Sequence, residues 1–218
     1  MKRKPKVIIV ISMTLIAIFL CLGCSGPQKM ALSNANNPQL TEKSIALFSL
    51  KMSNEYKPGF LPMVNTLEIK CEASGKSTHF TPERPHQQVK DDYVEYLVSL
   101  DLVPGQYTLG NVAGTSSGFL IIGSFRYPIG LGFHLPQDSI VYLGHITMNN
   151  RKKNQGEKSS GSMFPLLDQA ASGYSGGTFD INISDRSMLD IQVFETTYPI
   201  LRNYMVIPAV MERRSVAN

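Results

Sequence analysis

The sequence predicts a mainly β fold, a single antiparallel β-sandwich with one C-terminal helix, behind an N-terminal segment of different composition. Apolar and polar residues alternate along Tyr93 to Leu102, as in a strand with one buried face. The turn signature Pro104-Gly105 follows at once. Ser139 to Met148 is apolar at odd and even positions alike, which is typical of a central strand covered on both faces.

The other predicted strands follow from shorter stretches of the same kind. About 195 of the 218 residues lie beyond residue 23, enough for one domain with a proper core. Strands are expected at Ser44 to Met52, Thr66 to Glu72, Phe119 to Tyr127 and Thr178 to Ile183, and another begins at Tyr107. The polar residues 73–92 between them predict a loop.

One helix is expected near the C-terminus. Asp185 is a suitable N-cap, Ile191, Phe194 and Tyr198 recur at helical spacing, and Pro199 stops the pattern. We expect this helix to cover a face or an open end of the sandwich. The tail from Leu201 to Met211 predicts a last strand, and Pro208 favours an edge position for it.

The turn at residues 102–109 carries a resemblance. Its sequence, Leu-Val-Pro-Gly-Gln-Tyr-Thr-Leu, resembles the L-x-P-G-x-Y-x-L hairpin of transthyretin-like and related immunoglobulin-like sandwich domains. The likeness covers eight residues, so it supports the fold class and implies no function.

The N-terminus has the three parts of an export signal. Residues 2–6 include four basic residues, residues 7–23 carry no charge, and Leu22-Gly23-Cys24 places a small residue before a cysteine. This ending resembles the bacterial lipobox, the recognition sequence of signal peptidase II. The resemblance implies that Gly23 precedes the cleavage site and that Cys24 becomes the acylated first residue, with palmitate among its chains.

Two details qualify the lipobox. Cys21 stands where the motif usually has leucine. Ser25, rather than aspartate, follows Cys24, and by the sorting rule of the family this favours the outer membrane, facing the periplasm or the cell surface. The alternatives are an ordinary cleaved signal peptide and an uncleaved single-span anchor.

The chain therefore divides into a lipoprotein signal peptide at 1–23, a flexible tether at 24–43 and a sandwich domain at 44–218. The tether prediction rests on the polar composition of residues 25–43, with Asn34 to Pro38 at its centre. Four of the 21 basic residues lie in the signal, which leaves 17 basic against 17 acidic residues. This balance gives no reason to expect a nucleic-acid partner.

Removal of the signal and acylation of Cys24 would leave Cys71 as the last thiol. Leu67, Ile69 and Cys71 alternate along one strand, so we expect this sulfur on the buried face.

Two G-x-S-x-G matches raise the question of a serine hydrolase. They centre on Ser116 and Ser175, but neither has the strand-turn-helix context of a nucleophile elbow. No histidine follows Ser175, whereas Ser116 is followed by Asp138 and His145. An envelope hydrolase using Ser116 and His145 therefore stays as an alternative, and it requires the two side chains within about 3 Å of each other.

No cofactor motif is present, and the four histidines lack the spacing of a metal site, although a weak histidine-carboxylate site stays open as part of the same alternative. We interpret His145 as a satisfied core histidine. The favoured function is that of a non-catalytic, lipid-anchored envelope protein that binds a protein or glycan partner. The basic residues Arg151, Lys152, Lys153 and Lys158 mark its candidate partner-binding loop.

Overall fold

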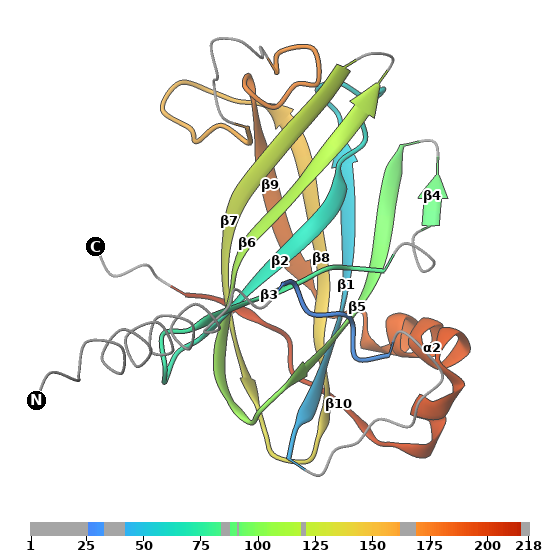
Figure 1. Ribbon diagram of the computed structural model, residues 1–218. Coiled ribbons are helices and arrows are strands. Elements are labelled where there is room, and N and C mark those ends of the chain that lie inside the picture. The colour runs from blue at the N-terminus through green and yellow to red at the C-terminus, as the bar shows by residue number, and fades with distance from the viewer. Residues whose placement is uncertain are drawn as a thin grey trace, which may run out of the picture.

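The computed structural model describes residues 26–32, 42–83, 88–90, 92–118, 121–161 and 169–214 (Figure 1). This part of the chain is mainly β, as predicted, and its strands form two sheets. The strands are β1 (Ser44–Asn54), β2 (Met63–Cys71), β3 (Ser77–Phe80), β4 (Gln88–Lys90), β5 (Tyr93–Leu102), β6 (Gly105–Gly118), β7 (Ile121–Leu135), β8 (Ile140–Lys152), β9 (Gly177–Ser184), β10 (Val206–Pro208) and β11 (Glu212–Arg213).

The first sheet has the order β10-β8-β1-β5-β4, and β9 also pairs with β8. The second sheet has the order β11-β7-β6-β2-β3. In the second sheet β6 and β7 form a long antiparallel hairpin that extends beyond the neighbouring strands (Figure 1).

Both sheets contribute to one apolar core. Leu50, Val98 and Ile146 come from the first sheet, and Leu67 and Leu109 come from the second, and all five are fully buried. Because successive side chains of a strand point to opposite faces, this core uses one face of each sheet.

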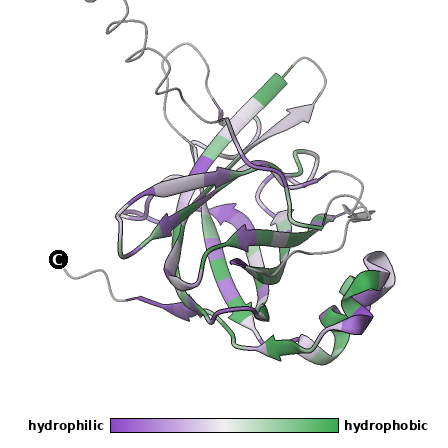
Figure 2. Cartoon of the chain, turned by 60° about the horizontal axis from the view of Figure 1, so that its bottom comes forward, coloured by the Kyte–Doolittle hydropathy of each residue, from purple (hydrophilic) through white to green (hydrophobic). Residues whose placement is uncertain are grey.

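A second apolar cluster covers the other face of the six-stranded sheet. It joins Leu47 and Tyr142 of the sheet to Phe194 of α2 (Ser187–Thr197) and Leu201 of the 3₁₀ helix η2 (Pro199–Asn203). The described residues hold this one α-helix, so the predicted C-terminal helix is confirmed, and Figure 2 shows it standing against the side of the sheets with both hydrophobic and hydrophilic residues along it. β8 is thus covered on both faces, which agrees with its two-sided apolar pattern.

The predicted N-cap of α2 is wrong by one residue, because Arg186 and not Asp185 is the N-cap, and it makes no side-chain capping bond. The Asp185 carboxylate accepts a hydrogen bond from the Ser187 N–H (2.8 Å), which satisfies one backbone donor at the start of the helix. The α-helix ends at Thr197, two residues before Pro199, where the chain tightens into η2.

The prediction that the strands pair only in antiparallel fashion is wrong. β1 pairs in parallel with β8, and β8 pairs in parallel with β10. Most of the chain between β1 and β8 belongs to the second sheet, so no short hairpin turn fixes the relative direction of these two strands.

The strand boundaries match the pattern to different degrees. β5 has the bounds predicted for it, whereas the loop predicted at residues 73–92 contains β3 and β4. These two strands have four and three residues, too few for an alternation to be recognised against polar neighbours.

Residues 206–214, the C-terminal strap, connect the two sheets. β10 pairs with β8, as the predicted last strand at an edge, and the Met211 N–H then bonds to the Leu143 carbonyl (2.9 Å). β11 pairs with β7 in the other sheet. Between these two pairings the Met211 side chain enters the shared core, with an exposure of 2%.

Candidate functional site

The residues of the predicted lipidation site, Gly23 and Cys24, lie outside the described residues, which begin at Gly26. Residues 26–32, the N-terminal segment, fall within the stretch predicted to be a flexible tether, yet they contact both sheets. The Gln28 N–H bonds to the His79 carbonyl (2.7 Å), and the Gln28 carbonyl accepts from the Thr81 N–H (3.0 Å). Gln28 thereby adds one bridge beyond the edge of β3.

The N-terminal segment then crosses to the first sheet. The Ala31 N–H bonds to the Ser99 carbonyl (2.8 Å), and the Leu32 N–H bonds to the Ser99 hydroxyl (3.0 Å). Met30 and Leu32 are each 3% exposed, Met30 in the shared core and Leu32 in the cluster beneath α2. The apolar run Met30-Ala31-Leu32 is too short to give a periodic signal, which is why this docking was not predicted from the sequence.

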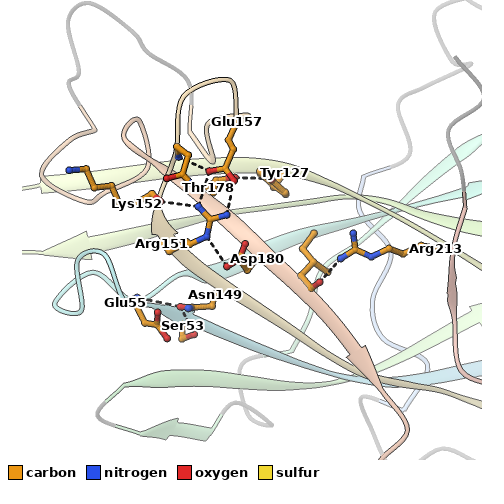
Figure 3. A network of polar contacts seen from close by, with 12 residues as sticks. Ser53, Glu55, Tyr127, Asn149, Arg151, Lys152, Glu157, Thr178, Asp180 and Arg213 are labelled. Atoms are coloured by element: carbon orange, nitrogen blue, oxygen red, sulfur yellow. Dashed lines mark hydrogen bonds and ion pairs between the residues drawn. The ribbon is translucent and has the colours of Figure 1, made fainter.

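The predicted partner-binding residues lie at the end of β8 and in the loop that follows it, and Figure 3 shows two of them, Arg151 and Lys152. Arg151 faces inward: its guanidinium donates to both oxygens of Glu157 (2.7 and 2.8 Å) and to Asp180 on β9 (2.8 Å). Lys153 donates to the Ser159 hydroxyl (2.6 Å). Lys152 and Lys158 are exposed. The four basic residues therefore divide into two that order the loop and two that present charge.

The ion pairs of Arg151 also affect its acidic partner. The hydrogen bonds from the Arg151 side chain and the Asn154 backbone lower the pKa of Glu157 to about 2. The Asn154 N–H is 2.6 Å from the Glu157 carboxylate. Glu157 is therefore ionised throughout the neutral range, and the loop stays closed around Arg151.

Ser116 and His145, the residues of the hydrolase alternative, are not brought together. Ser116 is buried on β6 of the second sheet, beside the Tyr174 hydroxyl. His145 lies on β8 and points to the α2 side of the first sheet, where its hydrogen-bond partners are Ser49 and Arg186.

Close packing accounts for the first glycine of this G-x-S-x-G match. A Cβ on Gly114 would overlap the Met63 carbonyl and approach the Phe125 ring to 2.6 Å. The motif thus occurs inside a strand pair and not at a strand-helix turn. Ser175, in the second match, is buried just before β9, and its carbonyl accepts from the Ser159 hydroxyl (3.0 Å).

A bulge determines where His145 points. Gly144 has a φ of +110°, and the register between β1 and β8 shifts at this place. The extra residue reverses the alternation of side chains along β8. As a result Tyr142 and His145 both face α2, while Leu143 and Ile146 both face the shared core. This local geometry requires glycine, and it turns a polar side chain toward the helix.

His145 belongs to a buried polar network that sequence reasoning missed. The Ser49 hydroxyl lies 2.7 Å from His145 Nδ1 and also donates to the Asp190 carboxylate of α2. The Tyr142 hydroxyl donates to the same carboxylate (2.7 Å), and Arg186 contacts His145 Nε2 (3.2 Å). We call these five residues the helix network. Its members lie far apart in the sequence, and Asp190 looks like an ordinary first-turn acid, so no local signal identifies it.

The helix network contains serine, histidine and aspartate, but not in the geometry of a catalytic triad. In a triad the histidine lies between the other two, whereas here the Ser49 hydroxyl bridges His145 and Asp190. The His145 Nδ1 to Asp190 distance is 3.6 Å, and Glu95 is 3.8 Å from the same nitrogen. Ser49, His145 and Asp190 are at most 3% exposed, so the hydroxyl faces no solvent-accessible cleft.

Several groups set the charge state of Asp190. Burial alone raises the pKa of its carboxyl, but the hydrogen bonds from His145, Ser49 and Tyr142 and the positive charge of Arg186 outweigh it and leave the pKa below its ordinary value. Burial and the Asp190 carboxylate raise the pKa of the Tyr142 phenol. This arrangement holds an ionised carboxylate beneath α2.

Cys71 is half-buried at the end of β2 and packs against the shared core, so it is less enclosed than its position in the alternation predicts. Hydrogen bonds from Ser74 lower the pKa of its thiol. The cause of the exposure is the turn that follows β2, since the strand ends at this residue.

The three histidines that the structure describes do not share a site. His79 and His134 are exposed on β3 and β7, and His86 lies outside the described residues. Within the described ranges no three His, Cys, Asp or Glu side chains come together in a way that could hold a metal ion.

Two shallow cavities mark the seam where β7 faces the first sheet. One, of about 370 Å³, is bordered by the C-terminal strap, with His134, Arg213 and Arg214 among its polar residues. The other, of about 400 Å³, lies between Tyr127 and Ile129 of β7 and Phe179 and Ile181 of β9. Arg213 borders both and donates to the Ile181 carbonyl, so it bridges the seam.

Comparisons with protein-family models, curated proteins and solved structures found no match to this chain. Among the described residues no helix combines the length and the hydropathy needed to cross a membrane.

Proposed function

We propose that this chain is a lipid-anchored protein of the bacterial cell envelope, in which Cys24 carries the acyl chains and the remainder has a non-catalytic binding or structural role. The observation that supports this proposal is the way the N-terminal segment is bonded to the fold. Its hydrogen bonds to the sheets begin at Gln28, so cleavage after Gly23 would retain every described contact of the fold. Cys24 is four residues before Gln28, so an anchor at this position would be tied closely to β3.

The folded part is, in this proposal, a β-sandwich. Support comes from the single apolar core to which both sheets contribute one face each. Ser25 after the lipidated cysteine favours the outer membrane, with the domain facing the periplasm or the cell surface.

The loop after β8 is proposed to present positive charge to an envelope protein or glycan. Arg151, held by Glu157 and Asp180, gives the loop a fixed shape, and Lys152 at the end of β8 and Lys158 in the loop are exposed. A preordered loop loses little conformational entropy on binding, which favours association.

The anchor is tested by metabolic labelling with a palmitate analogue, followed by membrane fractionation. Cys21→Ala and Cys71→Ala are the matched controls, because Cys21 leaves with the signal and Cys71 lies in the fold. We expect label in the wild type and in both controls and none in Cys24→Ala, which should remain in the membrane fraction as a larger protein because it retains the uncleaved residues 1–23. Each buried CH₂ contributes about 0.8 kcal/mol, so two chains hold a protein stably at the bilayer.

Label retained by Cys24→Ala would contradict the proposal, because acylation would then be at another residue. Absence of label from all four proteins would contradict it as well and would favour an ordinary signal peptide or a single-span anchor.

A further inference from the structure

The distance between the proposed anchor and the fold is short. Gln28 is held to β3 by backbone hydrogen bonds on both sides, to His79 and from Thr81. An extended chain spans at most about 3.6 Å per residue, so the four residues from Cys24 to Gln28 reach about 14 Å. With the acyl chains of Cys24 in a bilayer, the β3 edge of the second sheet therefore stays close to the lipid headgroups.

Three lysines surround this place, and we call them the basic edge. Lys29 is exposed and, by strand alternation, projects away from the buried Met30. Lys70 is exposed on β2 and pairs with Ser77 of β3, and Lys76 is exposed in the turn between the two strands. Neighbouring strands lie about 4.8 Å apart, so the part of β2 opposite Phe80 is about 10 Å from Gln28, and Lys70 lies three residues further along β2. Figure 1 shows the N-terminal segment, in blue, running from β3 toward α2.

The nearby carboxylates are already balanced by arginines. Glu68 pairs with Arg126 (3.0 Å) and Glu72 pairs with Arg214 (3.2 Å). Lys70 also lies near Glu72, which hydrogen bonds from Thr108 hold in its ionised form. The two acids and two arginines cancel, and Glu83, two residues after Thr81, offsets one of the three lysines, so the described part of this region keeps a net positive charge.

We propose that the basic edge rests on anionic phospholipid headgroups, so that the domain takes one orientation on its membrane. This inference rests on the proposed function, because only the anchor at Cys24 brings the edge to the bilayer. The charges are complementary, and the short connection supplies a high local concentration of headgroups. Each lysine near an anionic surface strengthens the contact about fivefold, so the loss of two weakens it about 25-fold.

The test measures how near two positions of the lipidated full-length mature protein come to the headgroups. A fluorophore is attached at Ser74→Cys, in the turn of the basic edge, or at Gln155→Cys, in the loop after β8, each in a Cys71→Ser background. β2 and β8 end at different ends of the sheets, so the two labels are well separated (Figure 1). The protein is reconstituted into phosphatidylethanolamine–phosphatidylglycerol vesicles that carry a headgroup-attached quencher.

We expect strong quenching at position 74 and little at position 155. Lys70→Glu with Lys76→Glu should abolish most of the quenching at position 74. Lys152→Glu with Lys158→Glu makes the same change of net charge away from the edge and should leave it unchanged. High salt, or replacement of phosphatidylglycerol by phosphatidylcholine, should reduce the quenching in the same way as the first pair.

Vesicle flotation distinguishes a failure of the lipid anchor from a failure of the proposed orientation. A protein that floats with the vesicles but shows equal quenching at positions 74 and 155, or equal effects of the two lysine pairs, overturns the orientation and leaves the anchor intact. A protein that does not float overturns the anchor, and with it the orientation.

Discussion

At the scale of single residues, the helix network explains why a sheet covered by apolar residues also buries three polar side chains. Ser49, His145 and Asp190 satisfy one another, and Tyr142 and Arg186 complete the set. A buried polar group with its hydrogen bonds made costs little, whereas the same group left without a partner costs about 1–3 kcal/mol. The network therefore fixes the position of α2 on the sheet through one carboxylate.

Asp190→Asn should lower the free energy of unfolding by about 2 kcal/mol at neutral pH, because the amide cannot accept all the bonds that the carboxylate accepts. The effect should depend on pH. Since the pKa of Asp190 is lower in the folded protein than its ordinary value of 3.8, its stabilising contribution is complete above that value and disappears as the pH falls through the folded pKa. Denaturant titration between neutral pH and pH 3 measures both effects.

Asp185→Asn is the matched control for this prediction. Its carboxylate is at the end of the same helix, but it is exposed and bonds to Ser187, so the expected loss is about 1 kcal/mol or less. Equal losses for Asp185→Asn and Asp190→Asn, or a loss at Asp190 that grows on acidification, would contradict the role assigned to the network.

At the scale of elements, α2 is attached through its inner face by the buried Phe194 and Asp190 and by the partly buried Ile191. Phe194 is fully buried and stacks on Tyr198, with the two ring centroids 6.4 Å apart. Met188, Leu189 and Val193 of the same helix are exposed. The helix therefore has apolar residues on both sides, and its stability comes from the inner side.

Phe194→Ala should cost about 3–5 kcal/mol, because it removes a buried aromatic side chain and leaves a cavity beneath the helix. Met188→Ala, at a position that is 87% exposed, should change stability by less than about 0.5 kcal/mol. Thermal and denaturant unfolding of the two variants measure these losses of stability. A neutral Phe194→Ala variant would mean that α2 does not pack on the sheet as described.

At the scale of the whole molecule, the C-terminal strap links the two sheets at the seam between β8 and β7. Met211→Ala should destabilise the entire fold by about 2–5 kcal/mol, since this side chain fills the shared core between the two strap pairings. Ile207→Ala, at a strap position that is 42% exposed, is the control and should cost much less. Local loss of the strap alone, seen as rapid proteolysis without a change in the unfolding midpoint, would contradict this view.

The sequence predicted the elements better than their assembly. β5 was predictable because its ten residues alternate clearly and end at a turn, and α2 because Ile191, Phe194 and Tyr198 recur at helical spacing before Pro199. The parallel pairing of β1 with β8 was not, because two strands with apolar residues on both faces carry no mark of direction. Nor was the helix network, whose residues Ser49 and Asp190 are 141 positions apart and meet only after the sheet and the helix have packed.

The central claim, that the mature chain begins at an acylated Cys24, is tested most directly by the mass of its N-terminal peptide. The membrane-extracted protein is digested and the peptide that ends at Lys29 is analysed by mass spectrometry. The account predicts a peptide that starts at Cys24 and carries a diacylglyceryl group. A peptide that starts elsewhere, or an unmodified Cys24 within a longer peptide, would contradict it.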